Sequence, residues 1–572
     1  MARFLVKGMG GMIPRLDPGA LPDQMAERAE DCDFRSGNLD GLPVLQHVIS
    51  LPGARKAFHF FNADHTDFVW LPLPSEFSSV VRSPLTNDDK RRLYWTNPGD
   101  LAPHWTTWDN IKAGVPPVDL GITHPPDTYQ LAVTATGGTA PDVLPWVARS
   151  YCFTYVNEFG EESAPNLPSE IVEGASDGTW TIIGLPPGQS PATTSGYNYL
   201  PATKIRLYRT VTGLQTGASF YMAGEWGIND APTPYIDVSR DLDIVNNLTL
   251  ISSNWSNPPE GIDGLVGLPG GMLVGFTGST IHFCEPFRPH AWVVAYDQSV
   301  LYDIVALTVW NQSLAILTSG YISAGTGNSP ANYTINQTQV AEPCISRGSV
   351  VTGLSGVMYS SQNGLIVTNY FKAELATLDT MSKDMWLTSY HGTTIKAARH
   401  RAEYIAIHEE GAFIFDMTDK QTGWILVNHL DNATSIWNDE EEGNTYVMIG
   451  GEVYLWDNAT MNKNTFTWRS KQFYRPAPVS IGAVHVTSSR RVDDNTLPPD
   501  PGGVLPDGVR VRFRIYAGSD FTLVMERDIQ KPTDIFRLPS GFRAFDWQVE
   551  IIGRVRVDSI ELASTMKELQ GV

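Results

Sequence analysis

The stretch Gly270–Pro286, GGMLVGFTGSTIHFCEP, decides the fold, and Asn444–Thr460, NTYVMIGGEVYLWDNAT, repeats its design. Each stretch has an apolar run, a short turn of glycine or polar residues, and a second run that carries an aromatic side chain. Apolar and aromatic runs that are separated by glycine turns are typical of antiparallel strand pairs. Both stretches are therefore predicted to be β-hairpins.

The same unit recurs between residues 256 and 465. A strand-pair unit that returns about every 40 to 50 residues is typical of a β-propeller, in which each blade is a small antiparallel sheet. Residues 43–124 have the same pattern, which predicts one propeller of about six to eight blades in two parts, 43–124 and 256–465. The other occurrences of the unit are Ser313–Gly327, Gly348–Asn369, Ala402–Asp419 and Thr422–Leu430.

Residues 125–255, between these two parts, are predicted to be an inserted β-sandwich of the fibronectin or immunoglobulin kind. Tyr151, Phe153 and Tyr155 alternate along one predicted strand, and further strands follow at turn-bounded intervals. The sequence lacks the Cys…Trp…Cys arrangement of true immunoglobulin domains. The proline residues that flank the segment are Pro116, Pro117, Pro125, Pro126, Pro258 and Pro259.

The two ends of the chain have different patterns. Residues 1–42 are predicted to be an arm with one short helix over Leu21–Cys32, where Pro22 suits a first helical turn. Residues 466–572 are predicted to be a C-terminal β-domain, because apolar residues from Val509 to Ile515 alternate with arginines. The arginine stripe favours a solvated outer face, and contact with an acidic neighbour is the alternative. Its members are Arg510, Arg512 and Arg514.

The composition fits an acidic all-β protein. The 572 residues are 42% hydrophobic and 18% charged, below the usual ~25% for soluble proteins. The net charge is −21, which disfavours specific binding to nucleic acid. After residue 465 there are 15 Lys and Arg against 13 Asp and Glu, which leaves 26 against 49 before it. The acidity therefore belongs to residues 1–465.

The four cysteines are far apart and have no CxxC spacing, which argues against a disulfide framework and a zinc site. The start of the chain lacks the apolar segment of a secretory signal. No apolar run approaches the ~18 residues that a membrane span needs. We therefore expect a protein that is kept in a cytosol-like compartment until assembly and is not stably inserted in a membrane.

Motifs for catalysis are weak. The segment Ala175–Trp180, ASDGTW, is similar to the Asp-box turn of sialidases, but its spacing differs and it occurs once, which favours a plain turn before a strand. His408-Glu409-Glu410 lacks the second histidine of a zinc-protease helix. The chain has neither a G-x-S-x-G elbow nor a phosphate-binding P-loop. We expect no catalytic residues, no cofactor and no metal ligands.

Four consecutive acidic residues, Asp439, Glu440, Glu441 and Glu442, form the densest carboxylate run of the chain. Their spacing is not the regular one of a Ca²⁺ loop. A channel-facing or tip loop is the functional interpretation of this run, and a solvated blade-tip loop is the alternative.

Several segments have distinctive residue patterns. The segment Gly275–Trp292 contains F-x-E-P-x-x-P-H-A-W, and Tyr151–Glu170 followed by Ile205–Thr210 has the pattern YCFTYVNEFGEESAPNLPSE…IRLYRT. PCISRGSVV and VMYSSQNGLIV add to the match. In the arm, Asp31 stands where the family pattern has Asn. The matching arm residues are Leu21, Pro22, Ala26, Ala29, Cys32, Ser36, Gly37 and Leu39.

These segments resemble the podovirus tail nozzle, or tail tubular protein B-like, family. The resemblance implies a structural subunit in the tail of a short-tailed virion, assembled in the bacterial cytoplasm. It implies a homo-hexameric ring that contacts the tail adaptor or head–tail connector above and fibres, spikes or a plug at its side or tip. Double-stranded DNA would pass through the ring without specific binding, and an acidic bore would repel its phosphates within a Debye length of ~8–10 Å.

Two other function classes stay open. A propeller-based tail protein that binds or depolymerises host glycan should show repeated Asp-boxes or a defined carboxylate pair, and the sequence shows neither. A receptor-binding or fibre-docking spike should show the repeats of a trimeric β-helix or coiled coil, and no such period is present. The sequence therefore favours the structural ring subunit.

Overall fold

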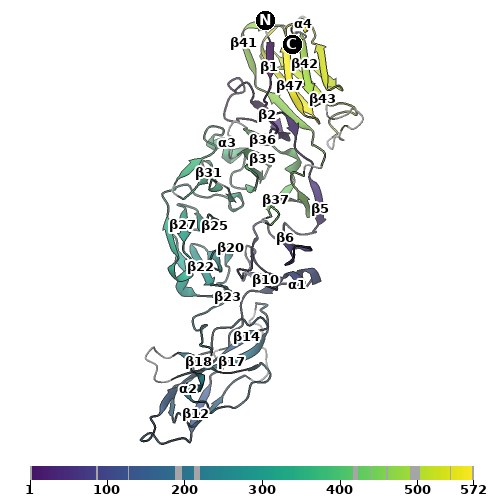
Figure 1. Cartoon of the computed structure of the whole chain (residues 1–572). Helices are drawn as coiled ribbons and strands as arrows, with labels where there is room; N and C mark the ends of the chain where they lie inside the picture. Colours follow the sequence, from purple (N-terminus) through teal and green to yellow (C-terminus); the bar gives the residue numbers. More distant parts are fainter. Residues whose placement is uncertain are drawn as a thin grey trace.

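The computed structural model shows an elongated chain in which a ring of small sheets lies between two β-sandwiches (Figure 1). Helices in the described residues are short, and none of them is long and apolar enough to span a membrane. They are α1 (Trp108–Ala113), α2 (Asp241–Ile244), α3 (Lys383–Thr388), α4 (Met566–Leu569), η1 (Val294–Tyr296), η2 (Pro330–Asn332), η3 (Arg347–Ser349) and η4 (Asn428–Leu430). The structure describes residues 3–569 except 86–87, 127, 187–195, 212–218, 354, 371, 417–422, 440, 459–460, 490–496, 498–502 and 541–542.

Seven antiparallel units follow one another around the ring, counted over the described residues. Strand β5 (Gln46–Ser50) completes the last unit, and the unit from β33 (Lys396–His400) to β36 (Trp424–Leu426) is one end of a larger sheet. The predicted all-β fold with a β-propeller is confirmed. The first units are β6 (Lys56–Phe61) and β7 (Phe68–Leu73); β8 (Ser79–Arg82), β9 (Arg92–Thr96), β10 (His104–Thr107) and β11 (Val118–Asp119); and β20 (Asp263–Leu268), β21 (Met272–Thr277), β22 (Thr280–Glu285), β23 (Arg288–Trp292) and β24 (Gln298–Ser299).

The remaining four units complete the circle. They are β25 (Ile304–Trp310), β26 (Ser313–Thr318), β27 (Ser323–Thr326) and β28 (Thr334–Gln337); β29 (Val351–Thr352), β30 (Val357–Ser361), β31 (Gly364–Thr368) and β32 (Ala373–Leu375); β33 (Lys396–His400), β34 (Glu403–His408), β35 (Gly411–Asp416) and β36 (Trp424–Leu426); and β37 (Ala433–Asn438), β38 (Thr445–Ile449) and β39 (Glu452–Leu455) with β5 (Gln46–Ser50).

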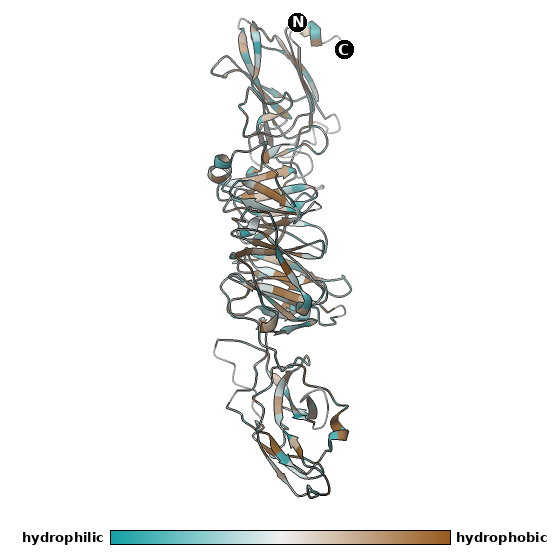
Figure 2. Ribbon diagram, turned by 90° about the vertical axis from the view of Figure 1, so that its left-hand side faces the viewer, coloured by the Kyte–Doolittle hydropathy of each residue, from teal (hydrophilic) through white to brown (hydrophobic). Residues whose placement is uncertain are grey.

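The apolar core of the ring is divided into clusters that lie between successive sheets. Phe60 and Leu73 of the first sheet pack on Trp95 of the second. On its other side the second sheet packs Trp105 against Trp292 of the third. Burying one such large side chain contributes roughly 1.5–3 kcal/mol. These contacts hold the blades side by side, and apolar residues accordingly run through the layered sheets in Figure 2.

Strand β5 closes the ring. Its residues pair antiparallel with β39, from Gln46 opposite Leu455 to Ser50 opposite Glu452. The last blade is thus built from both ends of the propeller sequence, so the ring cannot open at this place without breaking a strand pair. This pairing places residues 46–50 in one sheet with strands from residues 433–455.

The residues between β11 and β20 form a separate sandwich at the far end of the molecule (Figure 1). Its core contains Tyr151, Phe153 and Tyr155, whose side chains are buried as the alternation predicts. Its sheets are β12 (Ala132–Thr136), β16 (Thr179–Ile183) and β19 (Tyr235–Asp237); β13 (Val147–Arg149) and β15 (Val172–Gly174); and β14 (Tyr151–Asn157), β17 (Ala202–Thr210) and β18 (Phe220–Gly227).

The helix predicted over Leu21–Cys32 is wrong. Residues Ala26–Glu30 form strand β2, which pairs antiparallel with β40 and meets β36 through the pair Glu30 and Leu426. The local pattern allowed a helix, but the open edges of two sheets offer this backbone hydrogen-bond partners along its length. Ala26 and Ala29 become fully buried in that position, and tertiary pairing overrides the weak helical preference.

The C-terminal domain is a two-sheet sandwich that includes the N-terminal arm. One sheet has the order β1-β47-β42-β45, and the other continues from blade strand β36 through β2 into β40, β46, β43 and β44. The arm is therefore part of this domain. The bounds are β1 (Arg3–Val6), β2 (Ala26–Glu30), β3 (Cys32–Asp33), β4 (Asp40–Gly41), β40 (Phe466–Ser470), β41 (Phe473–Val479), β42 (Ala483–Ser488), β43 (Val511–Ala517), β44 (Thr522–Ile529), β45 (Thr533–Arg537), β46 (Ala544–Gly553) and β47 (Val557–Ala563).

The arginine stripe is neutralised inside this domain. Arg512 pairs with Asp528 on β44 at 2.7 Å, and Arg514 pairs with Glu526 at 2.7 Å. Arg510 is fully buried, so the expectation of a solvated outer face is wrong for this residue. Cross-strand ion pairs of this kind stabilise a sheet and leave little free positive charge for an acidic neighbour.

Candidate functional site

A cavity of about 860 Å³ lies at the centre of the ring. The first strand of each of the seven sheets contributes to its wall, which makes it the axial cavity of the propeller. The contributing residues include Lys56 of β6, Ser79 of β8, Gly264 of β20, Leu307 of β25, Val351 of β29, Lys396 of β33 and Ile436 of β37.

The wall of the axial cavity is basic, although the chain carries a net charge of −21. Five cationic side chains face two carboxylates among the lining residues. The cations are Lys56, Arg347, Lys396, Arg399 and Arg401, and the carboxylates are Glu76 and Asp439.

Three of these cations have carboxylate partners, and one of the three is Arg401, whose Nη2 lies 3.6 Å from Asp457. Arg347 forms a two-pronged ion pair with Asp263, with Nη2 at 2.8 Å from Oδ1. Nζ of Lys396 lies 3.2 Å from Glu76 and donates to the carbonyl of Thr434 at 2.8 Å. Burial alone would raise the pKa of Asp263, but the Arg347 guanidinium holds it below its usual value.

Lys56 and Arg399 differ from these three residues. Nζ of Lys56 donates to the carbonyl of Ser78 at 2.9 Å and has no carboxylate within ion-pair distance in the described chain. Burial, with the nearby charge of Arg347, lowers the pKa of Lys56 to about 8. The guanidinium of Arg399 has no hydrogen-bond or ion-pair partner among the described residues.

The sequence does not reveal this basic set, because its members come from three segments far apart in sequence, namely β6, η3 and β33 with the residue after it. Only closure of the ring brings them together. One weak sequence signal exists, since Lys56 and Lys396 each begin the first strand of a blade and each is followed by alanine.

The acidic run lies beside the axial cavity, in the turn between β37 and β38. Asp439 is buried, and its carboxylate lies 3.5 Å from Nδ1 of His59 on β6. Glu441 forms ion pairs with Arg82 and with Arg91, the latter at 3.4 Å. The alternative of a solvated loop is therefore wrong for these two residues, which tie the last blade to the first two. Glu440 lies outside the described residues.

One group in this turn has the geometry of metal ligands. Nδ1 of His59 and a carboxylate oxygen from each of Asp439 and Glu442 lie within 4.8 Å of one another. Asn444 at 2.8 Å and Tyr446 at 3.3 Å donate to Oε2 of Glu442 and orient it. These three residues could hold a divalent cation, yet His59 already serves as a partner for Asp439. That the chain binds no metal stays a prediction.

The two segments that resemble catalytic motifs, Ala175–Trp180 and His408-Glu409-Glu410, lie in turns and strand ends. Asp177 of the Asp-box-like segment accepts hydrogen bonds from the amide of Thr139 at 2.9 Å and from its hydroxyl at 2.6 Å, in a turn before β16. His408 ends strand β34 at the hairpin turn to β35. The interpretation of both segments as strand and turn is confirmed.

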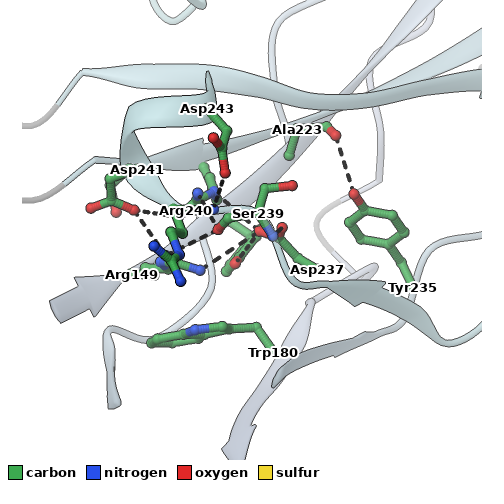
Figure 3. A network of polar contacts seen from close by, with 12 residues as sticks. Arg149, Trp180, Ala223, Tyr235, Asp237, Ser239, Arg240, Asp241 and Asp243 are labelled. Carbon is green, nitrogen blue, oxygen red and sulfur yellow. Dashed lines mark hydrogen bonds and ion pairs between the residues drawn. The ribbon is translucent and has the colours of Figure 1, made fainter. Parts of the chain in front are cut away.

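The inserted sandwich contains a buried ionic network near this turn (Figure 3). The guanidinium of Arg149 lies over the indole of Trp180, 4.6 Å from the ring centroid, and 2.9 Å from Asp241. Asp237, fully buried, pairs with Arg209 at 3.1 Å. Two arginines and two carboxylates balance in charge, which indicates a structural network that closes the end of the sandwich.

A second polar group joins the insert to the propeller. Glu161 of the insert lies 3.0 Å from Nη1 of Arg92 on β9 and 3.5 Å from Nδ1 of His290 on β23. The ring of Phe159 contacts Trp105 of β10 edge-on, with ring centroids 5.2 Å apart. Burial alone would raise the pKa of Glu161, but the His290 hydrogen bond and the Arg92 charge lower it. We name these five residues the joint.

The segment after the joint covers the edge of β14. Ser163 donates its amide to the carbonyl of Tyr155 at 2.9 Å, and its hydroxyl accepts from the Tyr155 amide at 3.0 Å. Asn166 donates its backbone amide to the carbonyl of Phe153 at 3.0 Å, and its side-chain Oδ1 accepts from the Phe153 amide at 2.7 Å. Both backbone groups of these strand residues are thereby satisfied. Covered edges do not recruit further strands, which protects the sandwich from aggregation.

Comparisons with known proteins show likeness at the level of shape only. No family model matches the chain, and no curated protein matches it. Among solved structures, the chain is similar to the WD40 domain of Neurospora crassa Pan2, with 9% identity over 51% of this chain and 86% of that chain, at a TM-score of 0.25.

Two further structures are similar. Hsv2 of Kluyvelomyces marxianus shares 12% identity over 46% of this chain and 71% of that chain, at a TM-score of 0.22. Glutaminyl cyclase of Myxococcus xanthus shares 8% identity over 44% of this chain and 84% of that chain, at a TM-score of 0.18. The sheet order described above, rather than these values, assigns the propeller fold.

Proposed function

We propose that the chain is a structural subunit of a short-tailed phage tail, which forms a homo-hexameric nozzle ring that conducts the genome during ejection. In this proposal it contacts adaptor proteins on one side and fibres, spikes or a plug on the other. The observation that carries the proposal is the joint. Residues from two of the segments that resemble the tail nozzle family meet there and hold the insert against the propeller.

The joint supports a building-block role. Glu161 belongs to the segment YVNEFGEESAP and His290 to EPFRPHAW, and the two lie 3.5 Å apart across the boundary between insert and propeller. A buried carboxylate between two basic partners holds the two bodies in one orientation. A fixed orientation is what a subunit needs when it must present the same surfaces to every neighbour in a ring.

The surface of the insert supports assembly as well. Its four most exposed apolar side chains are 67 to 84% accessible, and exposed apolar surface that gathers in a patch marks a place where another protein can bind. A neighbouring subunit or a fibre that packs on the insert would cover them. The most exposed are Val143, Ile171, Val238 and Leu242.

The charge distribution suits a DNA conduit. Residues 1–465 carry the excess of acidic side chains, and the arginines of the C-terminal sheet are paired within their own domain. A ring whose bore is acidic would repel DNA phosphates and keep the duplex mobile during ejection.

Native mass spectrometry and electron microscopy of the purified chain test the proposal. We expect closed rings of six copies, and six copies of the chain in each phage particle. The variant Val238→Glu/Leu242→Glu should weaken any contact of the insert, and Glu173→Gln on an exposed position of the same domain is the matched control. A chain that is monomeric at every concentration and absent from particles would refute the proposal. Release of sugar fragments from host capsule would favour a depolymerase instead.

A further inference from the structure

We propose that the axial cavity of the propeller is a binding site for a small ligand that carries a phosphate-like oxyanion, with Lys56, Arg347 and Arg399 as its cationic residues. The cavity measures about 860 Å³, within the range of ~300–1,000 Å³ that small-molecule sites occupy. This site is separate from the ring bore of the proposed function and does not depend on it.

The first argument is the charge balance at one corner of the cavity. Lys56, Arg347 and Lys396 gather there, and only two carboxylates, Glu76 and Asp263, pair with them. Glu76 is shared with Arg55, whose Nη1 lies 3.7 Å away. At least one positive charge is therefore left over, and Lys56 is the member of this group that has no carboxylate partner among the described residues.

The second argument is the environment of Lys56. Its ammonium group donates one hydrogen bond, to the carbonyl of Ser78, and an ammonium group has three donors. Burial and the neighbouring Arg347 both disfavour its charged form, and the lowered pKa reports this cost. An oxyanion beside Nζ would accept a free donor and supply the missing negative charge.

The third argument is the supply of further donors. Nη2 of Arg347 already reaches the hydroxyl of Ser79 at 3.4 Å, and both residues line the cavity. Arg399 lines the same cavity, and its guanidinium has no partner within the part of the chain that the structure describes. Guanidinium groups bind tetrahedral oxyanions through two parallel hydrogen bonds, which an isolated lysine cannot offer. The set therefore fits phosphate or sulfate groups better than halide ions.

The lining also argues against a cation. Glu76 pairs with Lys396, and Asp439 pairs with His59, so neither carboxylate is free to bind one. Burial would raise the pKa of both carboxyl groups, but their basic partners hold it below the usual value. A metal ion in this cavity would have to face the uncompensated charge of Lys56.

Isothermal titration of the full chain with sodium sulfate, phosphate and pyrophosphate tests the proposal, with sodium chloride at equal ionic strength as the blank. We expect saturable binding of the oxyanions, at least tenfold weaker in Lys56→Gln and in Arg399→Gln. Lys112→Gln is the matched control, because Lys112 pairs with Asp67 on the surface, away from the cavity. Its affinity should equal that of the unchanged chain.

Circular dichroism establishes that each variant is folded. The variant Lys56→Arg keeps the positive charge, and it serves as the second variant at this position if Lys56→Gln does not fold. Lys56→Arg should retain binding. Titration with adenosine monophosphate distinguishes two kinds of ligand. An affinity equal to that of phosphate indicates that the site binds the oxyanion alone, and a higher affinity indicates a phosphorylated organic molecule. Either result supports the site. Absence of saturable oxyanion binding, or equal binding by the folded Lys56→Gln and Arg399→Gln variants, would overturn it.

Discussion

Replacing Asp237 with alanine is expected to destabilise the inserted sandwich by about 3–5 kcal/mol, the usual cost of breaking a buried ion pair. The Asp237 carboxylate lies 3.1 Å from Nε of Arg209 and 3.9 Å from Nη1 of Arg149, and all three side chains are fully buried. It also accepts a hydrogen bond of 2.9 Å from the hydroxyl of Tyr151. In the variant, two buried guanidinium groups share the single carboxylate of Asp241.

Hydrogen exchange followed by mass spectrometry measures this change within the full chain. Because about 1.4 kcal/mol is a factor of ten, amides of β14 and β17 should exchange roughly two to four orders of magnitude faster in the variant. Amides in the propeller blades should keep their rates, since the network lies within the insert (Figure 3).

Two further variants make the measurement decisive. Glu173→Ala removes an exposed carboxylate of the same domain and should leave the exchange of β14 unchanged. Arg209→Met/Asp237→Leu removes both members of the pair and should cost less than Asp237→Ala alone, because no charge is then left without its partner. If Asp237→Ala protects β14 and β17 as well as the original chain does, the network does not stabilise the sandwich.

Three other outcomes follow from the structure. Sulfate binding should weaken between pH 7 and pH 9, because sulfate keeps its charge while Lys56, with a pKa of about 8, loses its proton. Calorimetric titration at several pH values measures the affinity for sulfate, and an affinity that does not change with pH would exclude Lys56 from the site. Glu161→Ala should raise the hydrogen-exchange rates in β23 and in the turn around Phe159, because Arg92 loses a partner across the joint. It should also broaden the distribution of molecular shapes that small-angle scattering reports, and an unchanged scattering curve would argue against the joint. Gly41→Val should lower the melting temperature, since a Cβ at Gly41 would lie 2.2 Å from a backbone carbonyl oxygen, and an unchanged melting curve would show that this approach is not tight.

Local pattern was enough to predict features that depend on neighbours in sequence. The alternation of Val511, Phe513 and Ile515 predicted a strand with one buried face, and all three side chains are fully buried. The hairpin of Gly270–Pro286 was predicted for the same reason, since strand periodicity and glycine turns act over a few residues. These features determine the all-β class.

Partner choice could not be predicted in the same way. The arm segment Ala26–Glu30 has composition that suits a helix, yet two sheet edges far away in sequence make it a strand. Asp439 has the pattern of a solvated acidic run, but His59, almost the whole propeller away in sequence, makes it a buried partner. Long-range partners decide both cases, and a single sequence does not name them.

The sequence by itself determined the strand content, the repeated blade unit and the excess of acidic residues before residue 466. The tertiary structure alone decided how the ring closes through β5, how the insert is held at the joint, and which cations line the axis. The physical reason is that hydrophobic periodicity is a local property, whereas the free energy of a buried charge depends on every group around it. Lys56 is one lysine among many in the sequence, and it becomes a candidate ligand residue because seven sheets enclose it.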